Sequence, residues 1–558
     1  MTTEAAAGAA PSTSGGAELT HRQILTILTG LLMGMFLAAL DQTIVATAIR
    51  TIADDLHGLS VQAWVTTAYL ITSTIATPLY GKLSDIYGRK PFFITAISIF
   101  VIGSLMCTFA TSMYMLAGFR ALQGIGAGGL FSLALAIIGD IVPPRERAKY
   151  QGYFLAVFGT SSVLGPVIGG FFAGADSIVG ITGWRWVFLV NVPIGIAALY
   201  VVNHTLNITH HRHDHRIDWK GAVALAVALV PLLTVAEQGR TWGWGSGRSI
   251  TAYVIGVVGI VAFLLAERSM GDEALIPLRL FRDRTVSVST VANIIIGVGM
   301  FGGIVSIPLY LQIVRGASPT EAGLQLLPMT LGIMSASIIS GQLISKTGRY
   351  KIYPVIGTAL ALVGLVLFAQ VNADTPLWQT MLVMFVFGFG LGNCMQPLVL
   401  AIQNAVSPRD IGVATSSATF FRQIGGTLGV AVFLSVLFSS LPDKLAAAFE
   451  RISPTPAFQA ALRDPANADF ARQLKTGGLK SLGALDDSSF LNTLDPRLAR
   501  PFLVGFSDSM SLVFWCAAAV MLVGLAVAVF LPQVELRTQS GLQAAAAERA
   551  AAQAPPAP

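Results

Sequence analysis

Charged residues are scarce in this sequence. Asp, Glu, Lys and Arg make up 11% of its 558 residues, whereas soluble domains usually carry about 25%. Hydrophobic residues reach 54%. Because so few charges cannot cover that much apolar surface in water, the composition argues against a soluble enzyme and indicates a protein embedded in a lipid bilayer.

Cysteines and catalytic motifs are also rare. The sequence has three cysteines, all within apolar stretches: Cys107, Cys394 and Cys516. They give no disulfide framework and are interpreted as packing residues. No G-x-x-x-x-G-K-S/T phosphate loop occurs, which disfavours a pump that hydrolyses its own ATP. No catalytic constellation is evident, so the sequence predicts neither an enzyme nor a bound cofactor.

Apolar runs of about 20 residues recur along the chain, and each is long enough to cross a ~30 Å hydrocarbon core as a helix. Fourteen are predicted, over residues 24–46, 61–80, 91–110, 113–140, 148–173, 184–204, 217–236, 249–266, 286–310, 323–345, 351–371, 378–400, 413–440 and 507–531. The first has no convincing cleavage site and is followed by further spans, so it is interpreted as a helix and not as a removed signal. The predicted fold class is an all-α integral membrane protein.

The basic residues predict the orientation. If the N-terminus is cytoplasmic, the inner short loops hold about 17 Lys and Arg and the outer short loops about five, in accord with the positive-inside rule. Both termini of this multi-pass chain are therefore expected in the cytoplasm, with the protein in the plasma or inner membrane. The net charge of +6 is spread over these loops, and it does not form the single basic face of a nucleic-acid-binding protein.

An internal repeat divides the chain. GKLSDIYGRK from Gly81 has a weaker copy, GQLISKTGRYK, from Gly341, at an offset of 260. Two further matches follow at an offset of 264: Gly124, Gly126 and Gly128 with Gly388, Gly390 and Gly392, and Pro144-Arg145 with Pro408-Arg409. A duplicated six-helix unit is predicted, with bundles over 24–204 and 286–531 and an inserted helix pair with linkers over 205–285. Residues 1–23 and 532–558 are expected to be disordered tails.

The glycines of the first half also match a dinucleotide-binding pattern. Gly124, Gly126 and Gly129 fit G-x-G-x-x-G, but that pattern requires a preceding strand and a βαβ unit. Neither is present here. Within an apolar helix, such glycines are expected to let backbones approach closely.

A long segment, 441–506, separates the last two predicted spans and is expected outside the cell, with helix over 443–451 and 457–475. It is longer than a connection requires. A lid and a partner-binding element are both compatible with its sequence.

Several motifs give the chain a family resemblance. They are LDQTIVATAI from Leu40, GKLSDIYGRKP from Gly81, RALQGIGAGG from Arg120, LGPVIGG from Leu164, WRWVFLVNVPIGI from Trp184, YLQIVRGASPTEAG from Tyr310 and FFRQIGG from Phe420. In this order they resemble the signature segments of the major facilitator superfamily, and more narrowly its fourteen-helix drug:proton antiporter branch. The resemblance implies two six-helix bundles around a central cavity, alternating access, and export of small hydrophobic or cationic compounds driven by proton entry.

Asp41 stands within the first predicted helix, where a carboxylate costs about 2.5–3.5 kcal/mol on insertion scales. Arg120, in the fourth helix, is its expected partner, because both residues lie roughly 10 Å deep in the outer half of the membrane. Protonation and cation binding could then be exchanged at one site. The resemblance likewise implicates the acid of helix 1 and the Arg of helix 4 in proton coupling. The alternatives are a helix-end marker for Asp41 and a purely structural ion pair.

The repeat adds an asymmetry. The second-half equivalent of Arg120 is Met384, and the window opposite Asp41, near Phe301 to Ser306, contains no acid. Proton coupling is therefore predicted in the N-terminal half, with the C-terminal half forming more of the substrate wall.

The loop after the second helix is predicted to gate the cytoplasmic side. Its candidates are Gly81, Asp85, Gly88, Arg89 and Lys90, together with Asp140 at the end of the fourth helix. In an outward-open state Asp85 is expected at a helix N-terminus, where anions are favoured by ~0.3–1 kcal/mol, and Arg89 is expected to pair with Asp140. The alternative role for the basic residues is to fix the orientation of the protein in the membrane.

The fifth helix carries Gly165, Pro166, Gly169 and Gly170. The glycines are expected to allow close packing and the proline to bend the helix or act as a hinge. In the family that the chain resembles, this segment is the antiporter signature, which favours export over uptake.

The candidate cavity residues are amphipathic groups suited to a broad pocket: Trp64, Tyr69, Asn293, Tyr310, Gln312, Asn393 and Gln396. For each, ordinary helix packing is the alternative. Arg422 is a second deep charge with no evident acidic partner, and it is expected either to bind an anionic substrate group or to be satisfied by helix carbonyls and water.

One histidine cluster could bind a metal ion: His210, His211, His213 and His215. A solvated polar loop is the favoured interpretation, and no metal is predicted.

Taken together, the sequence predicts a proton-coupled multidrug exporter whose partners are small-molecule substrates, protons and the bilayer. Two alternatives remain open. One is a dedicated exporter of an endogenous metabolite, lipid or peptide; the other, from a different class, is a membrane sensor.

Overall fold

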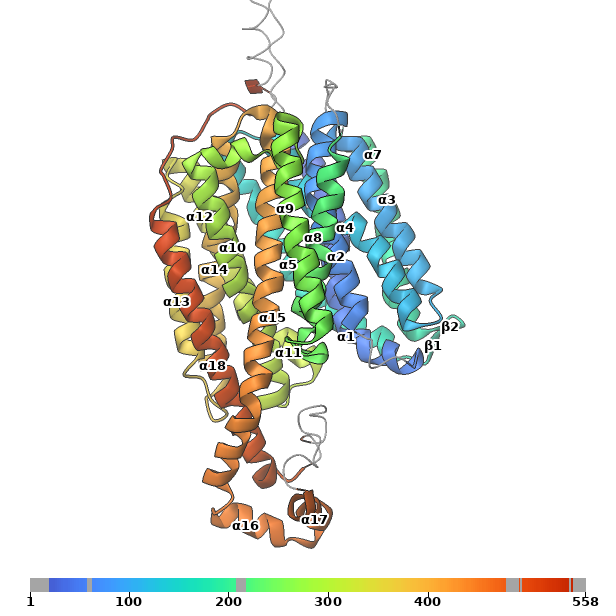
Figure 1. Cartoon of the computed structure of the whole chain (residues 1–558), viewed down its shortest axis with the longest axis vertical. Helices are drawn as coiled ribbons and strands as arrows, with labels where there is room; N and C mark the ends of the chain where they lie inside the picture. Colours follow the sequence, from blue (N-terminus) through green and yellow to red (C-terminus); the bar gives the residue numbers. More distant parts are fainter. Residues whose placement is uncertain are drawn as a thin grey trace, which may run out of the picture.

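The computed structural model describes residues 20–57, 63–206, 217–477, 491, 494–540 and 543–544, and this part of the chain is almost entirely helical (Figure 1). The helices are α1 (His21–Asp55), α2 (Ala63–Tyr87), α3 (Arg89–Thr108), α4 (Met113–Ile141), α5 (Pro144–Ala173), α6 (Trp186–Leu189), α7 (Asn191–Thr205), α8 (Trp219–Trp242), α9 (Gly247–Met270), α10 (Arg284–Leu309), α11 (Pro319–Gln325), α12 (Leu327–Thr347), α13 (Ile352–Phe368), α14 (Leu377–Ala405), α15 (Ile411–Ile452), α16 (Pro456–Arg463), α17 (Ala468–Gly477) and α18 (Pro496–Val529). Short helical turns are η2 (Gly183–Arg185), η3 (Gly271–Glu273), η4 (Leu278–Arg282), η5 (Tyr310–Val314), η6 (Pro408–Asp410) and η7 (Pro465–Asn467). The histidine cluster at 210–215 and most of the predicted tails lie outside the described residues.

Each of the fourteen predicted segments falls on one or more of these helices. Within the described residues, twelve helical stretches are long and apolar enough to cross a membrane. Those twelve do not include α2, and α13 is a shorter apolar helix of 17 residues. The count of fourteen crossings therefore stays a prediction.

The helices form two packed groups with separate hydrophobic cores. Helices α1 to α7 surround apolar side chains drawn from residues 24–206, such as Leu37, Phe100 and Leu133. Helices α10 to α18 surround a core that includes Phe387, Phe433 and Phe514. Because each group buries its own apolar surface, the two can move relative to each other without opening either core.

The glycines of the internal repeat make equivalent contacts in the two groups. A Cβ on Gly126 of α4 would meet the backbone of Ala96 in α3, and one on Gly390 of α14 would meet the backbone of Gly357 in α13. In the same way Gly124 abuts the carbonyl of Tyr69 in α2, and Gly388 abuts that of Met329 in α12. The sequence matches therefore correspond to the same helix contacts, as expected of a duplicated unit.

Helices α8 and α9 pack against each other on one side of the molecule (Figure 1). Helix α8 touches both groups through an apolar cluster that contains Leu225, Ile71 of α2 and Phe420 of α15. Helix α9 exposes much of its apolar surface, for example Val258 and Leu265. This pair therefore lies at the outside of the bundle, where its exposed side suits contact with lipid.

The structure corrects the predicted boundaries of the 441–506 segment. Helix α15 does not end at residue 440 but continues to Ile452, and α18 begins at Pro496. The two extensions pack on each other, since Phe449 contacts the ring of Phe502 at 4.9 Å and Gly505 lies against Leu445. The segment between them carries α16 and α17 and projects from the bundle at the bottom of Figure 1.

Two other features depart from expectation. A two-residue hairpin, β1 (Ser177–Ile178) with β2 (Ile181–Thr182), precedes α6. Its turn residues Val179 and Gly180 both have positive φ, the geometry that tight hairpins require. After α18, residues 532–537 were expected in a disordered tail but lie against the helix bundle. Tyr350 donates to the carbonyl of Pro532, and the N–H of Arg537 donates to Asn404.

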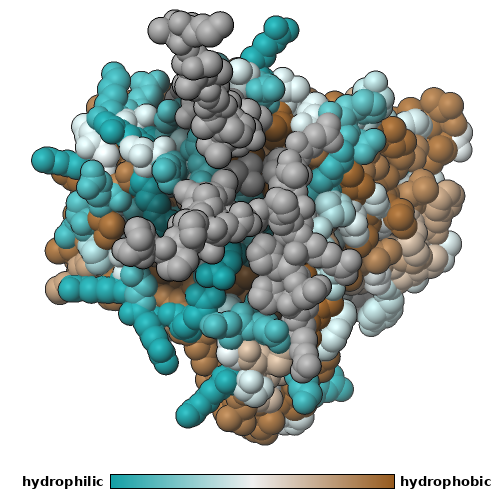
Figure 2. Space-filling model, turned by 90° about the horizontal axis from the view of Figure 1, so that it is seen from above, coloured by the Kyte–Doolittle hydropathy of each residue, from teal (hydrophilic) through white to brown (hydrophobic). Residues whose placement is uncertain are grey.

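One end of the molecule carries the start of α1, α5, α8 and α15, the end of α18, and Asp85; we call it the Asp85 face (top of Figure 1). His21 at the start of α1 contacts Tyr150 of α5 there, and residues 532–537 lie on the same face. Seen from this side, hydrophilic side chains gather on the face and hydrophobic ones appear at its rim (Figure 2). Both ends of the described chain thus reach the same side of the bundle.

Candidate functional site

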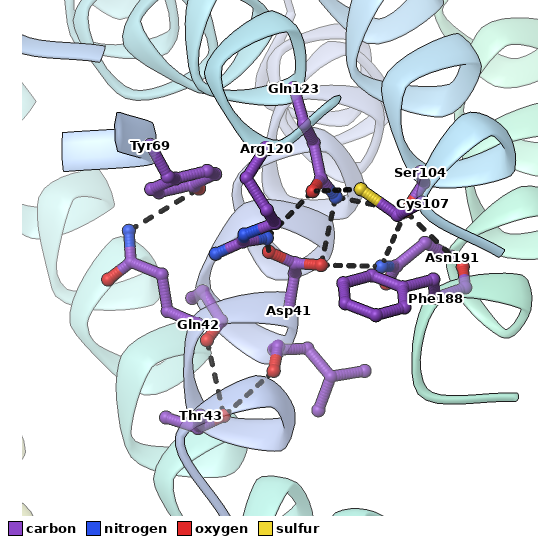
Figure 3. Close-up of polar contacts among 12 residues, drawn as sticks. Asp41, Gln42, Thr43, Tyr69, Ser104, Cys107, Arg120, Gln123, Phe188 and Asn191 are labelled. Carbon is purple, nitrogen blue, oxygen red and sulfur yellow. Dashed lines mark hydrogen bonds and ion pairs between the residues drawn. The ribbon is translucent and has the colours of Figure 1, made fainter. Parts of the chain in front are cut away.

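Asp41 of α1 stands at the centre of a buried polar group (Figure 3). Its side chain is 0% exposed. One carboxylate oxygen, Oδ2, accepts from Arg120 of α4 at 2.5 Å. The other, Oδ1, accepts from Gln123 at 2.9 Å and from Asn191 of α7 at 2.8 Å. Three donors from two helices thus stabilise a carboxylate that burial alone would destabilise.

Arg120 is held from several sides. Its Nη1 also donates to Gln123 Oε1 at 2.7 Å, and its guanidinium lies over the ring of Tyr69 at 4.1 Å. Cation–π contact of this kind favours the charged guanidinium. Among the described atoms, Arg120 Nε and Asn191 Oδ1 are buried without a hydrogen-bond partner. The site therefore keeps unused donor and acceptor capacity, which a rearrangement could engage.

Ser104 of α3 links the two amides. Gln123 Nε2 and Asn191 Nδ2 each donate to its hydroxyl at 2.9 Å, and that hydroxyl donates to the carbonyl of Phe188. The sequence predicted Asp41 and Arg120 but missed these three neutral residues. Gln123 lies in RALQGIGAGG and Asn191 in WRWVFLVNVPIGI, so their place in two of the resembling motifs was the available signal.

At the Asp85 face, Asp85 of α2 reaches the other helix group. Its Oδ2 accepts from the backbone N–H of Val413, in the first turn of α15, at 2.8 Å. Arg89 pairs with Asp85 at 2.5 Å and with Asp140 of α4 at 2.7 Å. The structure therefore brings together the predicted gating charges in the expected arrangement, with a carboxylate at a helix N-terminus.

The neighbouring residues of this loop have local reasons for their identity. Gly81 lies so close to Ser416 of α15 that a side chain would collide with it. Gly88 has a φ of 104°, which side chains other than glycine rarely adopt. Lys90 donates to the carbonyl of Asn203 in α7 at 2.6 Å. Of these features, only the contact of Gly81 with Ser416 joins the two helix groups.

A second crossing, by which we mean a place where hydrogen bonds join the two helix groups on the Asp85 face, was not predicted. Arg145 of α5 donates to the carbonyls of Ser345 and Lys346, at the end of α12, at 3.0 and 3.2 Å. Arg147 is buried and donates to Gln403 of α14 at 2.6 Å. Burial lowers the pKa of Arg147 to about 9. Hydrogen bonds thus join α2 to α15, and α5 to both α12 and α14, on this face.

The glycines of the predicted antiporter segment face different partners. Gly165 and Gly169 abut Thr43 and Ile44 of α1, one turn from Asp41. Pro166 lies against Gly323 of α11, and Gly170 faces Thr320. Helix α5 runs without a break through Pro166. The segment therefore packs closely between the Asp41 helix and the second helix group.

The predicted cavity residues do not converge in one described pocket. Asn293 and Asn393 donate to carbonyls of their own helices, those of Ser289 and Phe389. Tyr310 donates to the carbonyl of Asn372 in the loop after α13. These contacts agree with the packing alternative.

Four further candidates stand apart from those three. Trp64 is half-buried and Gln312 is exposed. Gln396 is buried, with an Oε1 that has no partner among the described atoms. Tyr69 belongs to the Asp41 group through Arg120.

Arg422 of α15 is half-buried. Within the part of the chain that the structure describes, no carboxylate forms an ion pair with it. A guanidinium at this depth without a counter-charge is costly, so it marks a functional candidate.

Comparison with known proteins supports the class that the fold and site define. The sequence profile of the Major Facilitator Superfamily matches residues 31–430. The chain is 34% identical over 545 residues to the multidrug transporter protein MdtP of Bacillus subtilis, covering 94% of this chain and 96% of that one. It is 38% identical over 425 residues to multidrug resistance protein 3 of the same species, covering 76% and 81%.

A solved structure shares the fold. That of the proton:xylose symporter XylE superposes with a TM-score of 0.56 at 15% identity, covering 95% of this chain and 100% of that one.

The chain belongs to the major facilitator superfamily. It is a multi-pass membrane transporter with the all-helical fold of that family and not an enzyme.

Proposed function

We propose that this protein exports small hydrophobic or cationic compounds in exchange for protons, by alternating access, with the proton gradient as its energy source and no bound cofactor. The observation that carries the proposal is the buried pair of Asp41 and Arg120. Names of relatives such as MdtP support multidrug efflux as the physiological role.

The Asp85 face is assigned to the cytoplasm. The excess of Lys and Arg in the loops on this side supports the assignment, and so do the hydrophilic residues seen there (Figure 2). The contacts of Asp85 with α15 and of Arg145 with α12 then close the cytoplasmic side. In this state substrate and protons would reach the centre from outside the cell.

In the proposed cycle Asp41 carries the proton. A proton on Asp41 removes the charge that Arg120 pairs with, and Arg120 can then turn toward Tyr69, over whose ring it already lies. Because α1 also packs on Gly165 and Gly169 of α5, a change at Asp41 reaches the helix that contacts the second group. Release of the proton to the cytoplasm and binding of substrate complete the exchange.

The test is uncoupler-sensitive efflux of ethidium from energised vesicles that carry the wild type or Asp41→Asn. We expect the variant to lose proton-driven efflux, because an amide cannot bind and release a proton. Asp508→Asn is the matched control. Asp508 is a half-buried helical acid of α18 and pairs with Arg451 of α15. Efflux that survives both the uncoupler and Asp41→Asn would refute proton exchange through this residue.

A dedicated exporter is the second candidate, and Arg422 is the observation that favours it. A guanidinium that no described carboxylate pairs with suits a substrate with an acidic group, such as a carboxylated metabolite or lipid. Transport of a carboxylated fluorescent compound, with no ethidium transport by the wild type, would favour this candidate.

A further inference from the structure

Two buried acids lie far from Asp41, where α8 begins and α9 ends on the Asp85 face. Asp218 is 3% exposed and Glu267 is 1% exposed. Asp218 Oδ1 accepts from the N–H of Gly221 at 2.7 Å, as an N-cap of α8. Glu267 Oε2 accepts from the N–H of Ile276, in the linker after α9, at 2.8 Å. One oxygen of each carboxyl group is therefore satisfied by the backbone.

The other two oxygens lie beside the same glycine, Gly221. Asp218 Oδ2 and Glu267 Oε1 are both buried and have no hydrogen-bond partner among the described atoms. Both lie beside the point where a Cβ on Gly221 would stand, the Glu267 oxygen at 2.9 Å and the Asp218 oxygen closer. At position 221, the side chain of any residue larger than glycine would stand between the two oxygens. Glycine leaves room for them to approach each other.

Among the described residues, no counter-charge is bonded to either oxygen. Lys82 of α2 is the nearby cation, but its ammonium group donates to the backbone carbonyl of Asp272 at 3.1 Å. Arg279 of the linker is paired with Asp272 and Asp410. Two adjacent carboxylates in a buried site cannot both stay ionised without compensation.

We infer that Asp218 and Glu267 share one proton, which forms a hydrogen bond between Asp218 Oδ2 and Glu267 Oε1 and makes the inserted helix pair a second proton-binding site. The proton satisfies both unpartnered oxygens at once and leaves a single negative charge near Lys82. A metal ion fits less well, because Ca²⁺ takes 6–8 oxygen ligands and the neighbouring backbone groups of Gly221 and Ile276 offer N–H donors.

The position of this site connects it to the Asp85 face. Glu267 holds the N–H of Ile276, and three residues further on Arg279 donates to both oxygens of Asp410, at 2.8 and 2.9 Å. Asp410 directly precedes α15, whose Val413 N–H binds Asp85. Loss of the shared proton would create repulsion between Asp218 and Glu267 and displace the linker whose Arg279 holds Asp410 at the start of α15. This site therefore responds to pH on its own side of the membrane, separately from Asp41.

Infrared spectroscopy of the purified full-length protein tests the shared proton through the carbonyl stretch of a protonated carboxyl group. We compare wild type with Glu267→Gln and Asp218→Asn at neutral pH, so that the contribution of Asp41 cancels in the difference spectra. Both changes keep the size and polarity of the side chain. Glu273→Gln, at a half-buried acid of the same linker, is the matched control.

We expect the wild type to show a band that is lost or displaced in both Glu267→Gln and Asp218→Asn and unchanged in Glu273→Gln. A band unchanged in both variants, or altered in only one, would overturn the shared proton. A rise in the melting temperature of wild type with Ca²⁺ or Na⁺ that Glu267→Gln abolishes would overturn it in favour of a bound cation. None of these results depends on whether Asp41 couples transport to protons.

Discussion

Asn191 of α7 donates a hydrogen bond to Asp41 of α1 at 2.8 Å, although 150 positions separate them in the sequence. The amide nitrogen also donates to Ser104 at 2.9 Å. Asn191 therefore fixes the carboxylate from the side opposite Arg120 and stabilises its ionised form. An amide in this place is a positioning residue for the proposed proton exchange.

Replacing Asn191 with Leu tests that role. Asn191→Leu keeps the branching of the side chain at Cγ and removes a donor to the ionised carboxylate, worth about 1.5–3 kcal/mol for a hydrogen bond to a charged group. The pH profile of efflux is expected to change, because the proposed proton carrier loses one of its hydrogen bonds. Asn203→Leu, at the exposed end of the same helix, should leave the profile unchanged. If Asn191→Leu, like Asn203→Leu, leaves the pH profile of efflux the same as that of the wild type, Asn191 has a packing role alone.

The closed Asp85 face should depend on the charge of Asp85. Asp85→Asn removes an anion from the N-terminus of α15, a loss of about 0.3–1 kcal/mol, and a partner from Arg89. We expect more molecules to open at this face, seen as longer distances between spin labels at Tyr87, the end of α2, and Arg409, just before α15. Glu535→Gln, an exposed acid on the same side, is the control. Unchanged distance distributions for Asp85→Asn would contradict the latch.

Enlarging either of two equivalent glycines of the repeat should lower the stability of the protein by a similar amount. In Gly124→Ala and Gly388→Ala the new methyl group meets the carbonyl oxygen of Tyr69 or of Met329. Overpacking of this kind costs about 1–3 kcal/mol, so both variants should melt at lower temperature in detergent. Gly118→Ala is the control within α4, because a Cβ there meets nothing within 4 Å. A large loss in only one of the pair would mean that the two contacts are not equivalent.

Arg422 is expected to affect the export of a substrate according to the charge of that substrate. Arg422→Gln removes the unpaired guanidinium of α15 and keeps a polar side chain. Export of carboxylated compounds is expected to fall at least tenfold, equivalent to about 1.4 kcal/mol of transition-state binding, while efflux of ethidium changes less. Parallel efflux assays with both probes in the same vesicles measure the ratio. An equal effect on both would assign Arg422 to the stability of α15.

Much of the site could be predicted because charge inside a membrane helix is expensive and therefore informative. Asp41 and Arg120 were found by their depth, and they meet as expected. Asn191 and Ser104 gave no such signal, since a neutral polar residue in an apolar run costs little and fits many kinds of packing. Their role depends on which helices become neighbours, and this information is tertiary.

The helix boundaries show the same division between local and tertiary information. The last part of α15 was predicted as a separate helix over 443–451, within the 441–506 segment, and not as a continuation of the preceding span. Leu441, Leu445 and Phe449 nevertheless share one side of a continuing helix and pack on α18. A stripe of this spacing is typical of an amphipathic helix, but its partner could not be known from the local pattern. The repeat, in contrast, predicted which glycines are equivalent, because duplication preserves contacts.

The two crossings of the Asp85 face use opposite charges at equivalent places. By the repeat offset, Ser345 of α12 corresponds to Asp85 of α2. At one crossing a carboxylate binds the N-terminus of α15, and at the other Arg145 binds the carbonyl end of α12. Burial raises the pKa of Asp85 to about 6, so that this carboxylate can lose its charge near physiological pH, whereas arginine stays protonated when solvated. Acid on this side of the membrane would thus weaken one crossing and spare the other, so that the two halves separate first between α2 and α15 and rotate about the contact between α5 and α12.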